Sequence, residues 1–150
     1  KGKFTYDFGD TGKMAPITHM YTLGHDFIPA GIHAGGLRYH GDSALLSQLY
    51  HDGYVEAQAV HQTDVFKAAV TFAKAESILP APESAHAIAV AISEANKCTE
   101  KGEDKAIFFN LSGHGHFDLS AYEAYNSGKL EDFEYTDEML KQGLATVPEV

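Results

Sequence analysis

The sequence has one cysteine and no tryptophan among its 150 residues. Cys98 has no second cysteine to pair with, so an internal disulfide is excluded. Its neighbours are Lys97 and Thr99, and neither a metal ligand nor a histidine that could activate the thiol lies next to it. We therefore interpret Cys98 as a bystander in a reducing, cytoplasmic environment.

Positive charge is also scarce. Lysine and arginine total 11 against 21 aspartates and glutamates, which gives a formal net charge of −10. Such a charge repels phosphate backbones, so nucleic acid is not an expected partner. No run approaches the roughly 18 apolar residues of a membrane-spanning helix, and no signal peptide opens the chain, so we expect no membrane insertion. The first residue is lysine rather than methionine, and we expect the chain to be part of a longer protein.

Glycine and histidine are concentrated in the first third of the chain. Residues 1–53 contain nine of the fourteen glycines and five of the nine histidines, a composition that predicts loops and short strands. Residues 54–60 alternate apolar with small or polar side chains and predict a strand. Apolar residues at helical spacing follow Thr63, which is therefore the predicted N-cap of a helix ending before Pro80.

The middle of the chain predicts further helices and one more strand. A second helix is expected between Pro82 and Gly102. Residues 106–109 form a short apolar run, typical of a strand buried on both faces of a parallel sheet. Ser120 and Glu123 have the spacing of a capping box at the start of a last helix. This order predicts an α/β fold with a layered parallel sheet, in which ligands bind at the carboxyl ends of the strands.

Two connections carry side chains suited to ligand binding. Residues 110–115 combine the hydroxyl of Ser112 with two glycines that let the backbone approach a ligand closely. Residues 80–86 place the carboxylate of Glu83 at the start of a helix, where the macrodipole favours an anion. The same patterns also fit an ordinary turn and an ordinary helix cap. The local sequence leaves both interpretations open.

Three segments in order resemble one known family. They are His33–Gly41 (HAGGLRYHG), Leu79–Ala87 (LPAPESAHA) and Phe109–Gly115 (FNLSGHG). Together these segments are similar to the tryptophan synthase β chain of the second type. The resemblance extends over residues 4–125, which is most of the chain.

The resemblance implies a fold type II enzyme dependent on pyridoxal 5′-phosphate. Residues 1–128 would form its C-terminal cofactor-binding lobe, without the N-terminal lobe, and residues 129–150 an acidic C-terminal extension. The implied reaction is the lyase-class β-replacement of serine or O-phosphoserine with indole to give L-tryptophan. The Schiff-base lysine and the catalytic base are expected outside this chain, which alone would be inactive. A cytoplasmic homodimer is implied, and partnership with an α chain stays open.

The family's cofactor contacts match residues in all three segments: Gly35, Gly36, Glu83, Ser112 and Gly113. Ser112 matches the serine that hydrogen-bonds the pyridine nitrogen, and a neutral hydroxyl, unlike an aspartate, does not hold that nitrogen protonated. Glu83 matches the glutamate beside the cofactor ring. The glycines match backbone positions near the ring, where the lack of a Cβ leaves room.

The sequence departs from the common β-chain pattern at Arg38 and His40, where that pattern has an aspartate and a proline. An arginine offers a planar fork that binds phosphate in bidentate fashion. The resemblance to the second type therefore implies that Arg38, together with His40, binds the phosphate of O-phosphoserine. A surface arginine in a glycine-rich loop is the alternative. The carbonyls of Tyr39 and Gly41 match a region that binds a monovalent cation in some family members.

Two other functions remain open from the residues themselves. His114 and His116 form an HxH pair, and a metal-dependent hydrolase could take further ligands from His25, His33 and His40. The chain could also be a non-catalytic ligand-binding or subunit-interface domain.

Overall fold

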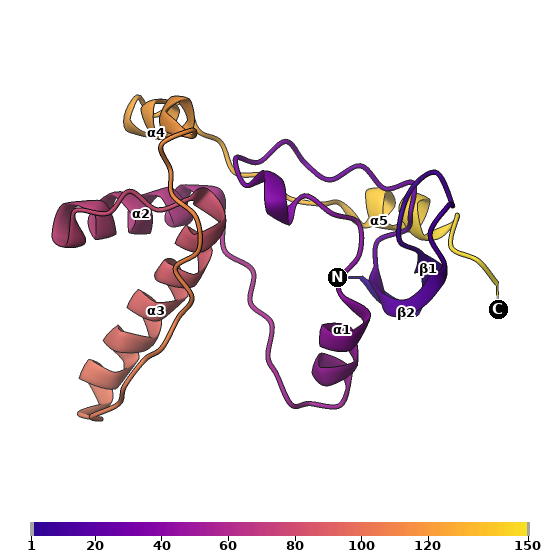
Figure 1. Cartoon of the computed structure of the whole chain (residues 1–150), viewed down its shortest axis with the longest axis horizontal. Helices are drawn as coiled ribbons and strands as arrows, with labels where there is room; N and C mark the ends of the chain where they lie inside the picture. The colour runs from indigo at the N-terminus through magenta and orange to yellow at the C-terminus, as the bar shows by residue number, and fades with distance from the viewer. Residues whose placement is uncertain (1, 150) are drawn as a thin grey trace. The chain divides into compact units, whose positions relative to one another are not determined.

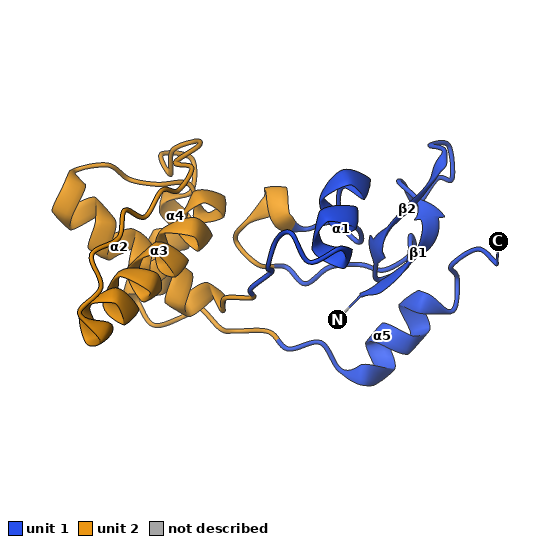
Figure 2. Ribbon diagram, turned by 90° about the horizontal axis from the view of Figure 1, so that it is seen from below, with its two compact units in different colours: residues 1–31, 38–58, 134–150 blue, residues 32–37, 59–133 orange. Residues whose placement is uncertain are grey.

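The computed structural model of the chain describes residues 2–149. Within that range the fold is mixed α/β, with a two-stranded sheet, five α-helices and the short 3₁₀ helix η1 (Gly35–Leu37). Figure 1 labels these elements along the chain, and their contacts define two compact units (Figure 2). Unit 1 comprises Lys1–Gly31, Arg38–Gln58 and Glu134–Val150, and unit 2 comprises Ile32–Leu37 and Ala59–Phe133.

Unit 1 is built around an antiparallel hairpin. Strand β1 (Lys3–Phe8) pairs with β2 (Ile17–Thr22), and the register places Phe4 opposite Tyr21. The rings of this cross-strand pair stack with 4.9 Å between their centroids, which stabilises the hairpin on that face. Helix α1 (Ala44–His51) contacts β2. The glycine-rich first third therefore contains the expected short strands and also a helix that its composition did not predict.

Helix α5 (Asp137–Leu144) also belongs to unit 1. Leu140 and Gly143 are its buried residues. A Cβ built on Gly24, which has a φ of +101°, would lie 1.9 Å from the carbonyl oxygen of Gly143. The helix and the turn after β2 can therefore approach each other this closely only because a glycine lies at the contact. The acidic tail thus contains a helix, α5, that packs against the turn after β2.

Unit 2 contains helices α2 (Gln62–Glu76), α3 (Pro82–Lys101) and α4 (Leu119–Asn126). Phe66 is 1% exposed and meets the ring of Tyr122 edge-on, with 5.0 Å between the centroids. Such pairs combine buried apolar area with a favourable ring geometry. The core cluster consists of Val65, Phe66, Ala69, Ala85, Ala121 and Tyr122.

Helices α2 and α3 confirm the two long helices predicted from the sequence, except for the predicted N-cap of α2. Helix α3 begins at Pro82, and Gly102 follows it in the left-handed conformation that favours glycine, with a φ of 65°. The predicted N-cap of α2 is wrong, because His61 occupies that position. The hydroxyl of Thr63 instead donates to Oδ2 of Asp132 over 2.6 Å.

The predicted capping box of the last helix is also wrong. Helix α4 begins at Leu119 after Asp118, so Ser120 and Glu123 lie inside the helix. Both are exposed, whereas Ala121 is buried in the core. Asp118, whose side chain makes no capping hydrogen bond, occupies the N-cap position.

The strands predicted over residues 54–60 and 106–109 are not formed, since β1 and β2 are the strands within residues 2–149. Residues 106–109 run on between α3 and α4 (Figure 1) without a strand beside them. Phe108 is 91% exposed and Ile107 39% exposed. A strand of a parallel sheet needs neighbours for its N–H and C=O groups, and none of the described residues supplies them.

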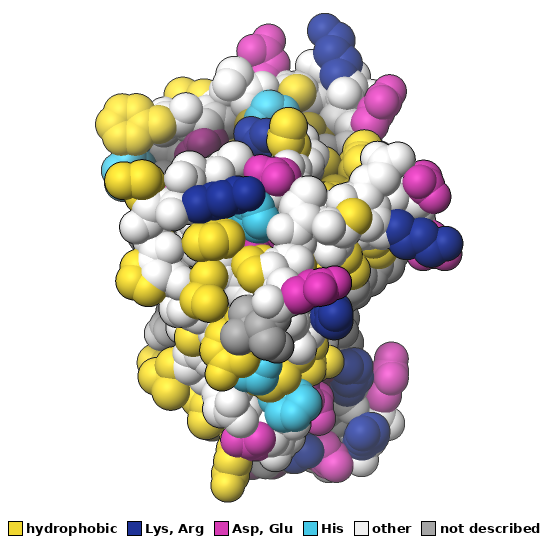
Figure 3. Space-filling model, turned by 90° about the vertical axis from the view of Figure 1, so that its right-hand side faces the viewer, with side chains coloured by type: hydrophobic (Ala, Val, Ile, Leu, Met, Phe, Trp, Pro, Cys, Tyr) yellow, Lys and Arg dark blue, Asp and Glu magenta, His cyan; other side chains and the backbone are white. Residues whose placement is uncertain are grey.

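Positively charged side chains are as scarce in the sequence as they are dispersed on the surface, with 11 lysines and arginines against 21 aspartates and glutamates. On the face drawn in Figure 3, lysine and arginine side chains are scattered among acidic and hydrophobic ones. No helix within residues 2–149 is both long enough and apolar enough to cross a membrane.

Candidate functional site

The first turn of α3 meets η1 in unit 2. The backbone N–H of Gly36 donates to Oε1 of Glu83 over 2.8 Å. A Cβ on Gly36 would lie 3.3 Å from both Cγ and Oε1 of Glu83, tighter than most side-chain contacts. The structure thus brings together two of the three segments that carried the family resemblance, although they are 47 residues apart. Gly35 is exposed, and a Cβ added to it would meet no atom within 4 Å.

The third segment is tied to the same helix end. The buried hydroxyl of Ser84 donates to the carbonyl oxygen of Ser112. Gly113 follows with a φ of +77°, and a Cβ there would lie 3.3 Å from that of Ala81. Glycine is favoured at this position because other residues rarely adopt that backbone conformation. The loop after residue 109 is therefore held against the start of α3.

Glu83 and Ser112 are both accessible in this arrangement. The side chain of Glu83 is half-buried and Ser112 is exposed. Within residues 2–149 the Ser112 hydroxyl has no hydrogen-bond partner. A carboxylate can accept hydrogen bonds, and a hydroxyl can both donate and accept them.

Arg38 and His40 lie in unit 1 and differ in their surroundings. Arg38 is exposed, and its Nη2 lies 3.4 Å from the carbonyl oxygen of Pro29. His40 is 6% exposed, and its Nε2 donates to the carbonyl oxygen of Phe8 over 2.9 Å. No carboxylate forms an ion pair with Arg38 within residues 2–149. The guanidinium is therefore open to an anion, whereas one nitrogen of the His40 ring is already engaged.

The neighbours of Arg38 are held by the hairpin. The Tyr39 hydroxyl donates to the carbonyl oxygen of Gly9. Burial, followed by the charges of Asp10 and Asp7, raises the pKa of Tyr39 above its ordinary value. Gly41 bridges to Thr22, so the segment after Arg38 lies along β2.

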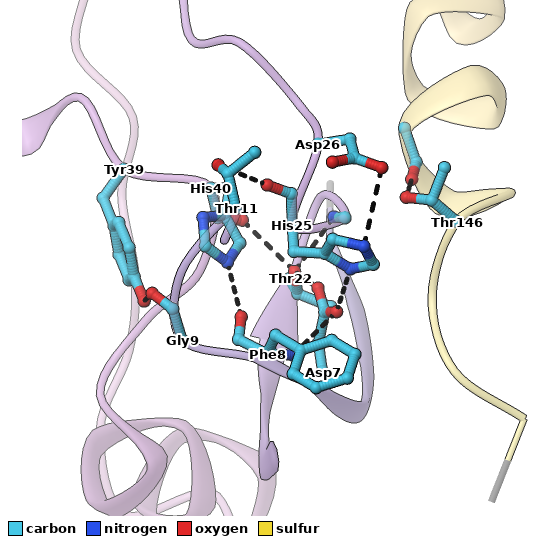
Figure 4. Close-up of polar contacts among 12 residues, drawn as sticks. Asp7, Phe8, Gly9, Thr11, Thr22, His25, Asp26, Tyr39, His40 and Thr146 are labelled. Carbon is cyan, nitrogen blue, oxygen red and sulfur yellow. Dashed lines mark hydrogen bonds and ion pairs between the residues drawn. The ribbon is translucent and has the colours of Figure 1, made fainter. Parts of the chain in front are cut away.

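A buried polar network in unit 1 was not predicted from the sequence (Figure 4). Nδ1 of His25 donates to Oδ1 of Asp7 over 2.7 Å, and the Thr22 hydroxyl donates to Oδ2 over 2.7 Å. All three residues are 0% exposed. Nε2 of His25 is buried without a hydrogen-bond partner in the described residues and lies 3.5 Å from Oδ2 of Asp26. His25 and Asp7 are 18 residues apart, and no local spacing indicates that they pair.

This network makes unit 1 sensitive to acid. Burial raises the pKa of Asp7, but hydrogen bonds from Thr22, His25 and Phe8 outweigh it and hold the pKa below the ordinary value of 3.8. A lowered pKa in the folded state stabilises the fold above the unfolded-state pKa, and this stabilisation is lost as the pH falls through the folded-state pKa. We expect Asp7→Asn to destabilise the protein by about 1–3 kcal/mol at neutral pH.

The measurement is the free energy of urea unfolding of the complete protein as a function of pH. Asp7→Asn should flatten the loss of stability below pH 3.8, whereas Asp104→Asn, at an exposed position, should leave it unchanged. If the Asp7→Asn variant and the unsubstituted protein lost the same unfolding free energy at low pH, the network would not contribute to the acid sensitivity.

The histidines do not assemble a metal site in the described structure. The rings of His114 and His116 lie 4.9 Å apart, and Nδ1 of His114 accepts the backbone N–H of His116. Within residues 2–149 no group of three or more histidine, cysteine, aspartate or glutamate side chains is placed to hold a metal ion. The HxH pair is therefore without a third ligand among the described residues.

In unit 2 the three segments therefore meet at the N-terminal end of α3. No family model matches the chain. The chain is 64% identical over 132 residues to the tryptophan synthase β chain 2 of Aquifex aeolicus and 60% identical over 131 residues to that of Methanosarcina mazei. It is 57% identical over 134 residues to the tryptophan synthase β chain of Pyrococcus horikoshii.

These matches cover 88%, 87% and 89% of this chain, respectively. The chain belongs to the tryptophan synthase β-chain family. It spans only about 30% of the length of these relatives.

Proposed function

We propose that this chain is the C-terminal part of a pyridoxal-phosphate-dependent tryptophan synthase. The complete protein would replace the β-substituent of serine or O-phosphoserine with indole to form L-tryptophan. The observation that carries the proposal is the meeting of three family segments at the start of α3, through Gly36 with Glu83 and Ser84 with Ser112. The names of the relatives support the same reaction.

The residues at this helix end fit the cofactor ring. The unpaired hydroxyl of Ser112 would donate to the pyridine nitrogen, and the carboxylate of Glu83 would lie beside the ring. Gly35, Gly36 and Gly113 would let the backbone approach it, because no Cβ occupies the space. When bound, pyridoxal phosphate supplies an electron-accepting ring. As a neutral donor, the hydroxyl of Ser112 would not fix a positive charge on that ring.

The rest of the enzyme would complete the fold and the chemistry. We propose a fold type II architecture in which residues 54–60 and 106–109 become strands of a layered parallel sheet when paired with the remaining polypeptide. Residues 1–128 would form the C-terminal lobe and residues 129–150 the acidic extension. The lysine bound to the cofactor and the catalytic base would come from the remaining polypeptide. The complete enzyme would be a cytoplasmic homodimer, and the carbonyls of Tyr39 and Gly41 would face a monovalent cation.

Arg38 supports O-phosphoserine as the amino-acid substrate. Its guanidinium is exposed and forms no ion pair within residues 2–149, so it is available to a phosphate. His40 would support phosphate binding by holding the loop that carries Arg38, since its Nε2 donates to the carbonyl oxygen of Phe8.

Ser112→Asp in the complete protein tests the proposal. Adding pyridoxal phosphate to the unsubstituted protein should produce a visible absorption band and tryptophan formation from indole. A carboxylate at residue 112 would pair with a protonated pyridine nitrogen, and we expect tryptophan formation to fall about tenfold or more, since a charge-assisted hydrogen bond differs from a neutral one by roughly 1.4 kcal/mol.

Ser120→Asp is the matched control, because Ser120 is exposed on α4. Its activity should equal that of the unsubstituted protein. Absence of the visible band in the unsubstituted protein, or unchanged turnover in Ser112→Asp, would overturn the proposed function.

A further inference from the structure

Tyr122 on α4 donates a buried hydrogen bond next to the start of α3. Its hydroxyl donates to the carbonyl oxygen of Pro80 over 2.6 Å. Tyr122 is 6% exposed. Burial, with a smaller contribution from the charge of Asp118, raises the pKa of Tyr122 to about 12. The hydroxyl therefore keeps its proton, and its role as a donor, across the physiological pH range.

The same stretch of backbone also holds the Ser112 loop. The N–H of Gly115 donates to the carbonyl oxygen of Leu79 over 2.9 Å. A Cβ on Gly115 would lie 2.5 Å from the Pro80 carbonyl oxygen and 3.0 Å from Cε2 of Tyr122. The Gly115 backbone, the Leu79–Pro80 backbone and the Tyr122 ring thus lie in close contact with one another.

The Tyr122 ring is itself fixed by the core. It meets Phe66 at an interplanar angle of 74°, and both residues belong to the core cluster of unit 2. The hydroxyl is therefore presented from α4, an element that carries neither Glu83 nor Ser112. Two hydrogen bonds, from Gly115 to Leu79 and from Ser84 to Ser112, join the two segments that carry those side chains. A third, from Tyr122 to Pro80, joins α4 to the segment that carries Glu83.

We propose that Tyr122 is a positioning residue that sets the spacing between Glu83 and Ser112 around the cofactor ring. Its hydrogen bond fixes the backbone three residues before Glu83, and its ring supports the glycine three residues after Ser112. This inference rests on the proposed function of the site. A shift of either segment would change the hydrogen bond at the pyridine nitrogen without removing any group that touches the ring.

Tyr122→Phe in the complete cofactor-loaded protein tests the proposal, because phenylalanine keeps the ring in the core. Tyr125→Phe is the matched control, since Tyr125 lies on the same helix and stacks on Phe66 with 6.0 Å between the ring centroids. Its hydroxyl has no hydrogen-bond partner within residues 2–149.

We expect Tyr122→Phe to weaken pyridoxal-phosphate binding about fivefold, the effect of losing one hydrogen bond of roughly 1 kcal/mol, and to lower kcat as well. KM for indole should stay nearly unchanged, and the pH dependence of the visible cofactor band should shift. Tyr125→Phe should change none of these quantities. An unshifted pH dependence in Tyr122→Phe, or an equal shift in both variants, would overturn the positioning role.

Amide hydrogen exchange in the cofactor-free protein separates this inference from the proposed function. Tyr122→Phe should accelerate exchange at Gly115 about fivefold, because the Leu79–Pro80 backbone loses one of its two hydrogen-bonded supports. If the unsubstituted protein shows no cofactor band, the proposed function fails. If the Gly115 amide exchanges at the same rate in Tyr122→Phe and Tyr125→Phe, Tyr122 does not position the loop.

Discussion

Gly115→Ala is expected to destabilise the protein by roughly 3 kcal/mol, the upper range for forcing extra volume into a packed interior. The new Cβ would lie 2.5 Å from the carbonyl oxygen of Pro80, a backbone atom that cannot rotate away. Cε2 of the Tyr122 ring would also lie only 3.0 Å from the new Cβ. The loop would have to move away from α3, and Ser112 would move with it.

Urea unfolding of the complete protein measures this change. Gly31→Ala is the control, because a Cβ at Gly31 meets no atom within 4 Å and Gly31 is exposed. It should leave the free energy of unfolding within about 0.5 kcal/mol of the original value. A Gly115→Ala protein as stable as Gly31→Ala would contradict the close packing between the loop and the start of α3.

Arg38→Asp is expected to lower the turnover of O-phosphoserine relative to serine by about ten- to a hundredfold, because a hydrogen bond to a charged group contributes roughly 1.5–3 kcal/mol. The substitution replaces an exposed guanidinium by a carboxylate that repels a phosphate. The measurement is kcat/KM for both amino acids with the complete enzyme at fixed ionic strength, since screening weakens exposed charge interactions.

Arg38→Lys separates charge from geometry. Lysine keeps the positive charge but lacks the planar fork. The preference of the Arg38→Lys protein for O-phosphoserine over serine should therefore fall between those of the unsubstituted and the Arg38→Asp proteins. An Arg38→Asp protein with an unchanged or increased preference for O-phosphoserine would contradict phosphate binding by Arg38.

The two long helices α2 and α3 and the short strands of the first third could be predicted, whereas α1 and α5 could not, and the strands predicted over residues 54–60 and 106–109 are not formed. Apolar spacing located α2 and α3 because an amphipathic helix is a local pattern. Residues 54–60 and 106–109 also have strand-like patterns, but strand formation depends on neighbours, and within residues 2–149 none lies beside them. The starts of α2 and α4 were misplaced, since His61 and Asp118 occupy the N-cap positions and the Thr63 hydroxyl instead donates to Asp132.

By itself the sequence determined the periodicity of the long helices, the acidic balance and the three segments that identify the family. Only the tertiary structure decided which side chains meet. It joined Gly36 to Glu83 across 47 residues and Tyr122 to Pro80 across 42. It also buried the carboxylate of Asp7 against His25. Such contacts depend on how helices, loops and the hairpin pack. Packing between segments that are distant in the chain produces no local sequence pattern from which the contact could be predicted.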